Sequence, residues 1–96
     1  MIRISFTTTF EKWLNKLKDR KAKALINQHL DRIVIGNLGN TRFVGDGIFE
    51  KKINYAGGYR LYYFLNGEDW IILLCGGDKS TQQKDIELAK KIKKGL

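Results

Sequence analysis

Residues 59–75, YRLYYFLNGEDWIILLC, decide the fold of this chain, because they contain two strand-like runs around a turn signal. The runs at 59–65 and 70–75 are rich in aromatic and β-branched residues, which favour strands. Asn66-Gly67 follows the first run, and this pair is typical of the tight turn of a β-hairpin. The segment therefore predicts two neighbouring antiparallel strands.

A third strand is expected immediately before this hairpin. Residues 48–55 form another β-rich run, and Ala56-Gly57-Gly58 separates it from the run at 59–65. The three runs together predict a meander. Upstream lies a loop region rich in glycine and asparagine, in which residues 42–44 can begin a strand. Gly76-Gly77 is expected to end the last strand of the meander.

Helical spacing occurs towards both ends of the chain. Alternating apolar residues at 2–6 predict a short strand, and the capping box Thr8-x-x-Glu11 then precedes a helix over 10–17. Asp19 can cap a second helix that ends at Gly36, and Ser80-x-x-Gln83 opens a lysine-rich last helix. The order β-α-α-β-β-β-α predicts one α+β domain over residues 1–96. We expect a mostly antiparallel sheet packed on an N-terminal helical hairpin, with a C-terminal helix.

The composition narrows the class of partner and compartment. The chain has 18 Lys and Arg against 10 Asp and Glu, which gives a net charge of +8 and a pI near 9.8. Such an excess is typical of proteins that meet polyanions, above all nucleic acid. One cysteine cannot form an internal disulfide, and no apolar run approaches the roughly 20 residues of a membrane span. We therefore expect a cytoplasmic protein that does not engage a membrane. One histidine and one cysteine also exclude a Cys/His zinc site.

The strand period of two indicates a candidate binding face. Glu50 and Lys52 share one face of their strand, whereas Phe49 and its apolar neighbours share the other. Arg60 and Tyr62 likewise share a face of the next strand. The sheet can therefore present a polar, aromatic and mainly cationic surface on a rigid frame. Such a surface is what RNA binding requires.

Three smaller features are weaker evidence of function than this surface. Residues 77–81, GDKST, have a faint similarity to a P-loop, but Asp78 stands where that motif has the glycine before its lysine. Lys79 directly precedes a helix, where backbone amides and the helix dipole attract a phosphate, and a purely structural cap explains it equally well. His29 and Cys75 fall in apolar stretches, and we expect both to be core residues.

The segments 47–53 (GIFEKKI), 58–63 (GYRLYY) and 76–90 (GGDKSTQQKDIELAK) contain the most specific features of the sequence. With them the chain resembles the HigB-like killer proteins of the RelE/ParE toxin superfamily. The resemblance extends upstream through Trp13 and Asp19 and covers nearly the whole chain. It implies a microbial type II toxin with a compact α+β fold.

The resemblance also implies partners and site residues. Such toxins are neutralised by a co-encoded antitoxin, often a helix-turn-helix repressor, and meet operator DNA only through the antitoxin complex. Many relatives enter the ribosomal A site and cut translated mRNA, and no cofactor or metal is expected. By position, the catalytic residues correspond to Lys52, Arg60, Lys79 and Asp85. Further RNA contacts are expected from Arg42, Glu50, Lys51, Tyr62, Gln82 and Lys84.

RNA can be cut without a metal when its 2′-OH attacks the adjacent phosphate. Arg60 is the natural clamp for the phosphate oxygens, because its planar fork stays charged. Lys52 and Lys79 are candidates for proton transfer, with Glu50 or Asp85 as the competing base. Two other functions stay open: a ParE-like, non-enzymatic inhibitor of DNA gyrase, and a plain basic RNA-binding module.

Overall fold

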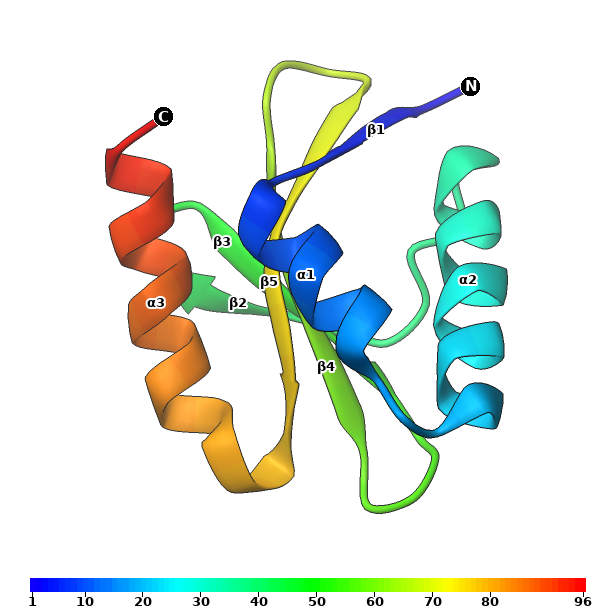
Figure 1. Cartoon of the computed structure of the whole chain (residues 1–96). Helices are drawn as coiled ribbons and strands as arrows, with labels where there is room; N and C mark the ends of the chain where they lie inside the picture. Colours follow the sequence, from blue (N-terminus) through cyan, green and yellow to red (C-terminus); the bar gives the residue numbers. More distant parts are fainter.

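The computed structural model describes residues 1–96 and contains one five-stranded sheet in the order β1-β5-β4-β3-β2 (Figure 1). Its elements are β1 (Arg3–Phe6), α1 (Thr8–Lys16), α2 (Arg20–Val34), β2 (Thr41–Gly45), β3 (Ile48–Ile53), β4 (Tyr59–Leu65), β5 (Trp70–Asp78), the 3₁₀ turn η1 (Lys79–Thr81) and α3 (Gln82–Lys94). Strand β1 pairs parallel with β5, and every other pair is antiparallel. The predicted α+β class with a mostly antiparallel sheet and a C-terminal helix is confirmed.

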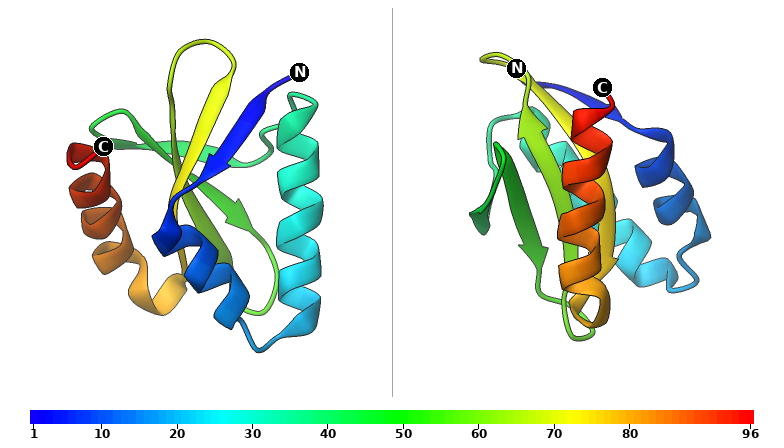
Figure 2. Two further views of the ribbon diagram at one scale, coloured as in Figure 1. Left: turned by 45° about the horizontal axis from the view of Figure 1, so that its top comes forward. Right: turned by 90° about the vertical axis from the view of Figure 1, so that its left-hand side faces the viewer.

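The helical hairpin of α1 and α2 buries its apolar stripe against one face of the sheet. Phe10 from α1 and Ile26 from α2 are fully buried there, beside Leu61 and Leu73 from the strands. Each such side chain contributes about 1.5–3 kcal/mol when it leaves water. Figure 2 shows α1 and α2 together and α3 apart from them. The predicted packing of the sheet on the N-terminal hairpin is therefore confirmed.

Helix α3 covers the opposite face of the sheet, over β4 and β5. Ile86 and Ala89 pack there against the buried side chains of Tyr62 and Leu74. Cys75 belongs to the same cluster, and burial raises the pKa of its thiol to about 12, as expected for an inert core residue. None of the three helices combines the length and apolar composition that crossing a bilayer requires.

The structure adds a strand to the predicted order. Residues Thr41–Gly45 form β2, so the chain runs β-α-α-β-β-β-β-α and the three-stranded meander becomes four-stranded. A tight turn at Asp46 and Gly47, both at positive φ, joins β2 to β3. Asp-Gly is a strong hairpin signal. The sequence offers this strand only as a possibility at 42–44, because the glycines and asparagines around it are typical of a loop.

Gly76-Gly77 does not end β5 but lies within it. The strand continues to Asp78, and both glycines are buried. A Cβ atom on Gly76 would collide with the ring of Trp13, and one on Gly77 would collide with the Asp85 carboxylate. The two glycines therefore let α1 and α3 approach the two faces of β5 closely.

Two helix starts differ from the sequence prediction. Thr7, not Thr8, caps α1: its hydroxyl accepts from the Phe10 N–H at 3.1 Å and donates to the Leu74 carbonyl at 2.6 Å. Asp78, not Ser80, caps the turn before α3, because its carboxylate accepts from the Ser80 N–H at 2.9 Å. The intervening 3₁₀ turn delays the start of α3 to Gln82.

Candidate functional site

A small hollow lies on the α3 side of the sheet, at the N-terminal end of α3. Its charged members are three cations, Arg42, Lys52 and Arg60, around one anion, Glu50. The strand register produces this grouping, because Arg42 pairs with Glu50 across β2–β3 and Lys52 pairs with Arg60 across β3–β4. We call this hollow the basic pocket; it is lined by Asn40, Arg42, Glu50, Lys52, Arg60 and Gln82.

Glu50 organises the basic pocket from its floor. It is 4% exposed, and its Oε1 accepts from Arg42 Nε at 2.9 Å. Its Oε2 accepts from the Tyr62 hydroxyl and from Gln82 Nε2, each at 2.9 Å. Burial raises the pKa of Glu50, but the hydrogen bonds from Arg42, Gln82 and Tyr62 outweigh burial and hold the pKa below its ordinary value. Glu50 is therefore ionised, and both of its oxygens are engaged.

Tyr62 supports this network from below. The sequence predicts Tyr62 on the same sheet face as Arg60, and the register confirms this. The predicted exposure of Tyr62 is wrong, because α3 packs directly over the ring and buries it completely. Burial, followed by the hydrogen bond to Glu50, raises the pKa of Tyr62 far above its ordinary value. Tyr62 thus stays protonated as a permanent donor to Glu50 and offers no surface for a base to stack on.

Arg60 is the unusual residue of the basic pocket. It is 5% exposed, its Nε lies 3.9 Å from Glu50 Oε2, and that Nε has no hydrogen-bond partner. Its only side-chain hydrogen bond is a long one, 3.5 Å from Nη1 to the Gly58 carbonyl. Nε is buried and faces Glu50, so an acceptor from outside the chain cannot reach it. The Nη groups, which line the basic pocket, are the donors that remain available to such an acceptor.

The backbone around Gly58 brings Lys52 next to Arg60. Gly58 has a φ of +104°, and a Cβ there would stand 3.3 Å from Arg60 Nη1 and 3.4 Å from Lys52 Cε. The Lys52 N–H donates to the Asn40 carbonyl at 3.0 Å, which holds the loop before β2 against the pocket. Asn40 is a pocket residue that sequence reasoning missed, because only this long-range pairing places it there.

Lys79 lies in a second hollow beside the basic pocket. That hollow, which we call the Lys79 hollow, lies between the loop at 56–58 and the turn at 78–80. Gly58 lines it and also contacts the side chains of Lys52 and Arg60, so the two hollows adjoin. Lys79 itself is exposed. The structure thus joins Lys52 and Arg60 in one pocket and places Lys79 in the neighbouring one.

Asp85 and Lys84 do not line either hollow. Asp85 is half-buried in the first turn of α3, where it accepts from the Thr81 hydroxyl at 2.6 Å. Burial raises the pKa of Asp85, and the charge of Asp78 adds to this effect. Lys84 is exposed on α3. No group of three or more His, Cys, Asp or Glu side chains lies close enough together to hold a metal ion.

Lys51 was predicted to contact RNA, and this prediction is wrong, because Lys51 lies on the opposite face of the sheet. It is 1% exposed, and its Nζ donates to the Leu38 carbonyl at 2.6 Å. Burial, aided by the charge of Arg32, lowers the pKa of Lys51. The sequence already indicates this position, because successive side chains of a strand point to opposite faces, so residue 51 faces away from residues 50 and 52.

Residues 12–94 match the family described as "Phage derived protein Gp49-like (DUF891)". The chain belongs to this Gp49-like family. An uncharacterized protein of Haemophilus influenzae (strain ATCC 51907 / DSM 11121 / KW20 / Rd) is 52% identical to the Gp49-like chain over 89 residues. That alignment covers 93% of this chain and 90% of the relative. Both hollows lie inside the matched segment.

Solved toxin structures share the fold of the Gp49-like chain. A mutant of the E. coli toxin RelE in the free state superposes with a TM-score of 0.71 at 15% identity, covering 99% of this chain and 98% of that one. The intact E. coli RelBE toxin-antitoxin complex gives 0.63 at 16% identity, over 81% and 96% of the two chains. The RelBE2 toxin-antitoxin complex of Mycobacterium tuberculosis gives 0.59 at 23% identity, over 81% and 98%. At these identities the likeness establishes the RelE-like fold.

Proposed function

We propose that the Gp49-like chain is the toxin of a type II toxin-antitoxin system, HigB-like within the RelE/ParE superfamily, and that it cuts mRNA on the ribosome without a metal. The single observation that carries the proposal is the Arg60 guanidinium, which lines the basic pocket while its two Nη groups share only one long hydrogen bond within the chain. The fold shared with RelE supports the toxin class. The net charge of +8 supports an RNA substrate.

The basic pocket suits a phosphodiester for electrostatic reasons. Three cations face one carboxylate, and that carboxylate already accepts three hydrogen bonds from within the chain. An incoming phosphate would give Arg60 a charge-assisted partner, which is stronger than a neutral hydrogen bond. Glu50, 3.9 Å from Arg60 Nε, keeps the guanidinium in place before the substrate arrives. Such preorganised donors stabilise charge that develops in a transition state.

The reaction needs one proton removed and one supplied. The 2′-oxygen bonds to phosphorus as the bond from phosphorus to the 5′-oxygen breaks, leaving a cyclic phosphate and a free 5′-hydroxyl. Arg60 holds the non-bridging oxygens, and Lys52 protonates the departing 5′-oxygen. We assign removal of the 2′-OH proton to Lys79 in the adjoining hollow. Proton transfer of this kind contributes about 10²–10⁴-fold, so the ribosome must supply much of the remainder by positioning the mRNA.

The assignment of proton transfer to Lys52 follows from the pocket's composition. Arg42 and Arg60 cannot give up their protons, and Asn40 and Gln82 do not titrate. Both oxygens of Glu50 are occupied by donors. Lys52 is the remaining side chain in the basic pocket that can exchange a proton.

Induction of the chain in growing cells, followed by primer extension on mRNA, tests the proposal. The wild type should arrest growth and leave cuts in register with the reading frame. Arg60→Ala and Lys52→Ala should abolish both effects while the proteins remain folded by circular dichroism. Arg20→Ala, at an exposed arginine on α2, is the matched control and should behave like the wild type.

Two outcomes would contradict the nuclease. An Arg60→Ala or Lys52→Ala protein as toxic as the wild type would remove the basic pocket from the mechanism. Growth arrest with intact mRNA and a DNA-damage response would instead indicate the gyrase inhibition typical of ParE-like toxins.

A further inference from the structure

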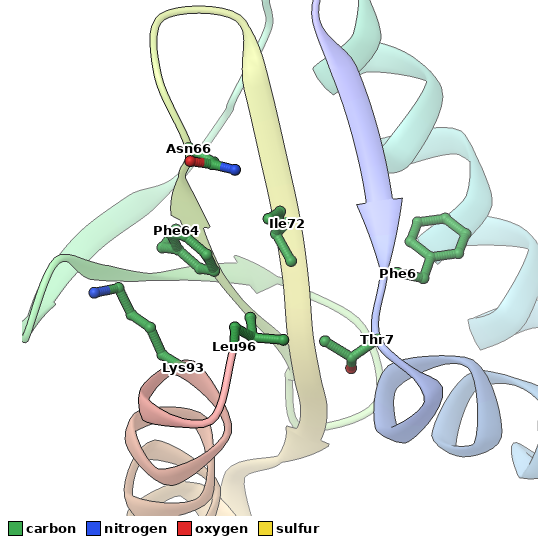
Figure 3. Close-up of a pocket in the computed structure, with 7 residues that line it drawn as sticks. All are labelled: Phe6, Thr7, Phe64, Asn66, Ile72, Lys93 and Leu96. Carbon is green, nitrogen blue, oxygen red and sulfur yellow. The ribbon is translucent and has the colours of Figure 1, made fainter.

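A second part of the sheet face on the α3 side lies beyond the C-terminal end of that helix. Phe64 of β4 and Ile72 of β5 pair across the strands there, and Leu96 reaches over them from the end of the chain (Figure 3). They belong to a groove of about 450 Å³, which we call the distal groove; it is lined by Phe6, Thr7, Phe64, Asn66, Ile72, Lys93 and Leu96. All four apolar side chains keep part of their surface in water, and Leu96 is 70% exposed.

Cations border the distal groove on the side of α3. Lys93 closes one side, with its ammonium 5.2 Å from the centre of the Phe64 ring. It also lines an adjoining hollow of about 390 Å³ with Lys90, Lys94 and Asp46. The surface therefore combines an apolar floor with a positively charged rim.

This combination selects among possible occupants. A second copy of the chain in a symmetric contact would bring Lys90, Lys93 and Lys94 against one another, which like charges oppose. RNA would satisfy the lysines and could stack a base on Phe64, but it has no aliphatic groups to cover Ile72 and Leu96. An acidic amphipathic segment satisfies both parts of the surface at once.

We infer that the distal groove binds an acidic amphipathic segment of the antitoxin. Aliphatic side chains of the segment cover Phe64, Ile72 and Leu96, and its carboxylates face the lysines at the end of α3. The choice of the antitoxin as the source of this segment rests on the proposed function. Disordered acidic segments often fold as they bind such surfaces.

The length of α3 separates the distal groove from the basic pocket. Gln82 in the basic pocket and Lys93 in the distal groove lie at opposite ends of α3, about 16 Å apart at 1.5 Å per residue. A segment held in the distal groove does not itself occupy the basic pocket. Antitoxin binding and RNA cleavage are therefore separable by mutation.

The test measures the affinity of the full chain for the protein encoded beside it, the expected antitoxin, by calorimetry. Lys93→Glu should weaken binding about tenfold through charge reversal at the rim. Leu96→Glu should weaken it about tenfold or more by placing a like charge on the apolar floor. Leu96 is mostly exposed, so its replacement leaves the fold intact. Lys16→Glu, the same charge change on the far helix α1, is the control and should bind within about twofold of wild type.

Each other result overturns the inference. If both groove variants bind as the Lys16→Glu control does, the antitoxin docks elsewhere. If they bind the antitoxin normally but lose toxicity or self-association, the groove serves the ribosome or a second copy. If the wild type does not bind the co-encoded protein, the antitoxin assignment is wrong. The nuclease proposal fails separately, since binding is measured without cleavage and Arg60→Ala should still bind.

Discussion

Replacing Glu50 by glutamine probes the arrangement on which the basic pocket depends. The substitution keeps the shape of the side chain but removes its charge and turns an NH₂ group towards one of the three donors that now point at the carboxylate. One lost charge-assisted hydrogen bond costs about 1.5–3 kcal/mol, and the donor left facing another donor costs about 1–3 kcal/mol more. Allowing for relaxation, we expect Glu50→Gln to lower the free energy of unfolding by about 3 kcal/mol near neutral pH.

The sign of the pH dependence follows from the depressed pKa of Glu50. Its folded pKa lies below the ordinary value of 4.5, so its stabilising contribution is complete above that value and is lost as the pH falls through the folded pKa. A protonated Glu50 resembles glutamine. The stabilities of wild type and Glu50→Gln should therefore converge as the solution is acidified.

Urea unfolding followed by tryptophan fluorescence, at neutral and acidic pH, measures both effects. Glu68→Gln is the control, because Glu68 is exposed in the turn between β4 and β5, and its change should stay within about 0.5 kcal/mol. A loss below about 1 kcal/mol for Glu50→Gln, or a loss that does not change with pH, would refute the view that an ionised Glu50 holds the pocket together.

Three further predictions concern the cap of α1, the core cysteine and the role of Lys52. Thr7→Ala should lower the free energy of unfolding, measured with urea, by about 1–2 kcal/mol because it removes the α1 cap. Thr8→Ala, at the cap expected from the sequence alone, should lower it much less. Equal losses would show that Thr7 is not the cap. With the pKa of Cys75 raised to about 12, the folded protein should resist Ellman's reagent at mildly alkaline pH and react promptly in urea, and fast native labelling would contradict the burial. Lys52→Arg should keep RNA binding but slow cleavage by about 10² or more, since arginine cannot exchange a proton, and unchanged cleavage would remove Lys52 as the proton donor.

Short-range sequence patterns were sufficient to predict most of the fold. The hairpin after Leu65 and the Asp19 cap of α2 follow from short-range rules, and both are confirmed. The pairing of Lys52 with Arg60 follows from the strand period once two antiparallel neighbours are assumed, and the register confirms it. The same rule places Lys51 on the other face, where it is buried.

The remaining features depend on contacts that no local pattern contains. The spacing of apolar residues along α3 shows that the helix has a buried side but not which sheet face it covers, so the burial of Tyr62 could not be predicted. Gln82 reaches Glu50 across 32 positions of sequence, and Asn40 enters the pocket through a hydrogen bond from the Lys52 backbone. The prediction that Gly76-Gly77 ends the strand is wrong because glycine is common both at strand ends and inside strands that a neighbouring element approaches closely.

These contacts also explain why Arg60 can persist with an unpaired donor. The helix that buries Tyr62 supplies Gln82 as well, so the packing that stabilises the second core also gives Glu50 a hydrogen-bond donor. Because Tyr62 and Gln82 take both lone pairs of Oε2, the oxygen nearest to Arg60 Nε, Arg60 is held nearby at 3.9 Å but is not hydrogen-bonded to it. A chain selected for stability alone would replace such a guanidinium by an apolar residue. The reason to assign Arg60 a ligand is accordingly its place in one pocket with Arg42 and Lys52, and a phosphate is the ligand that these cations accept.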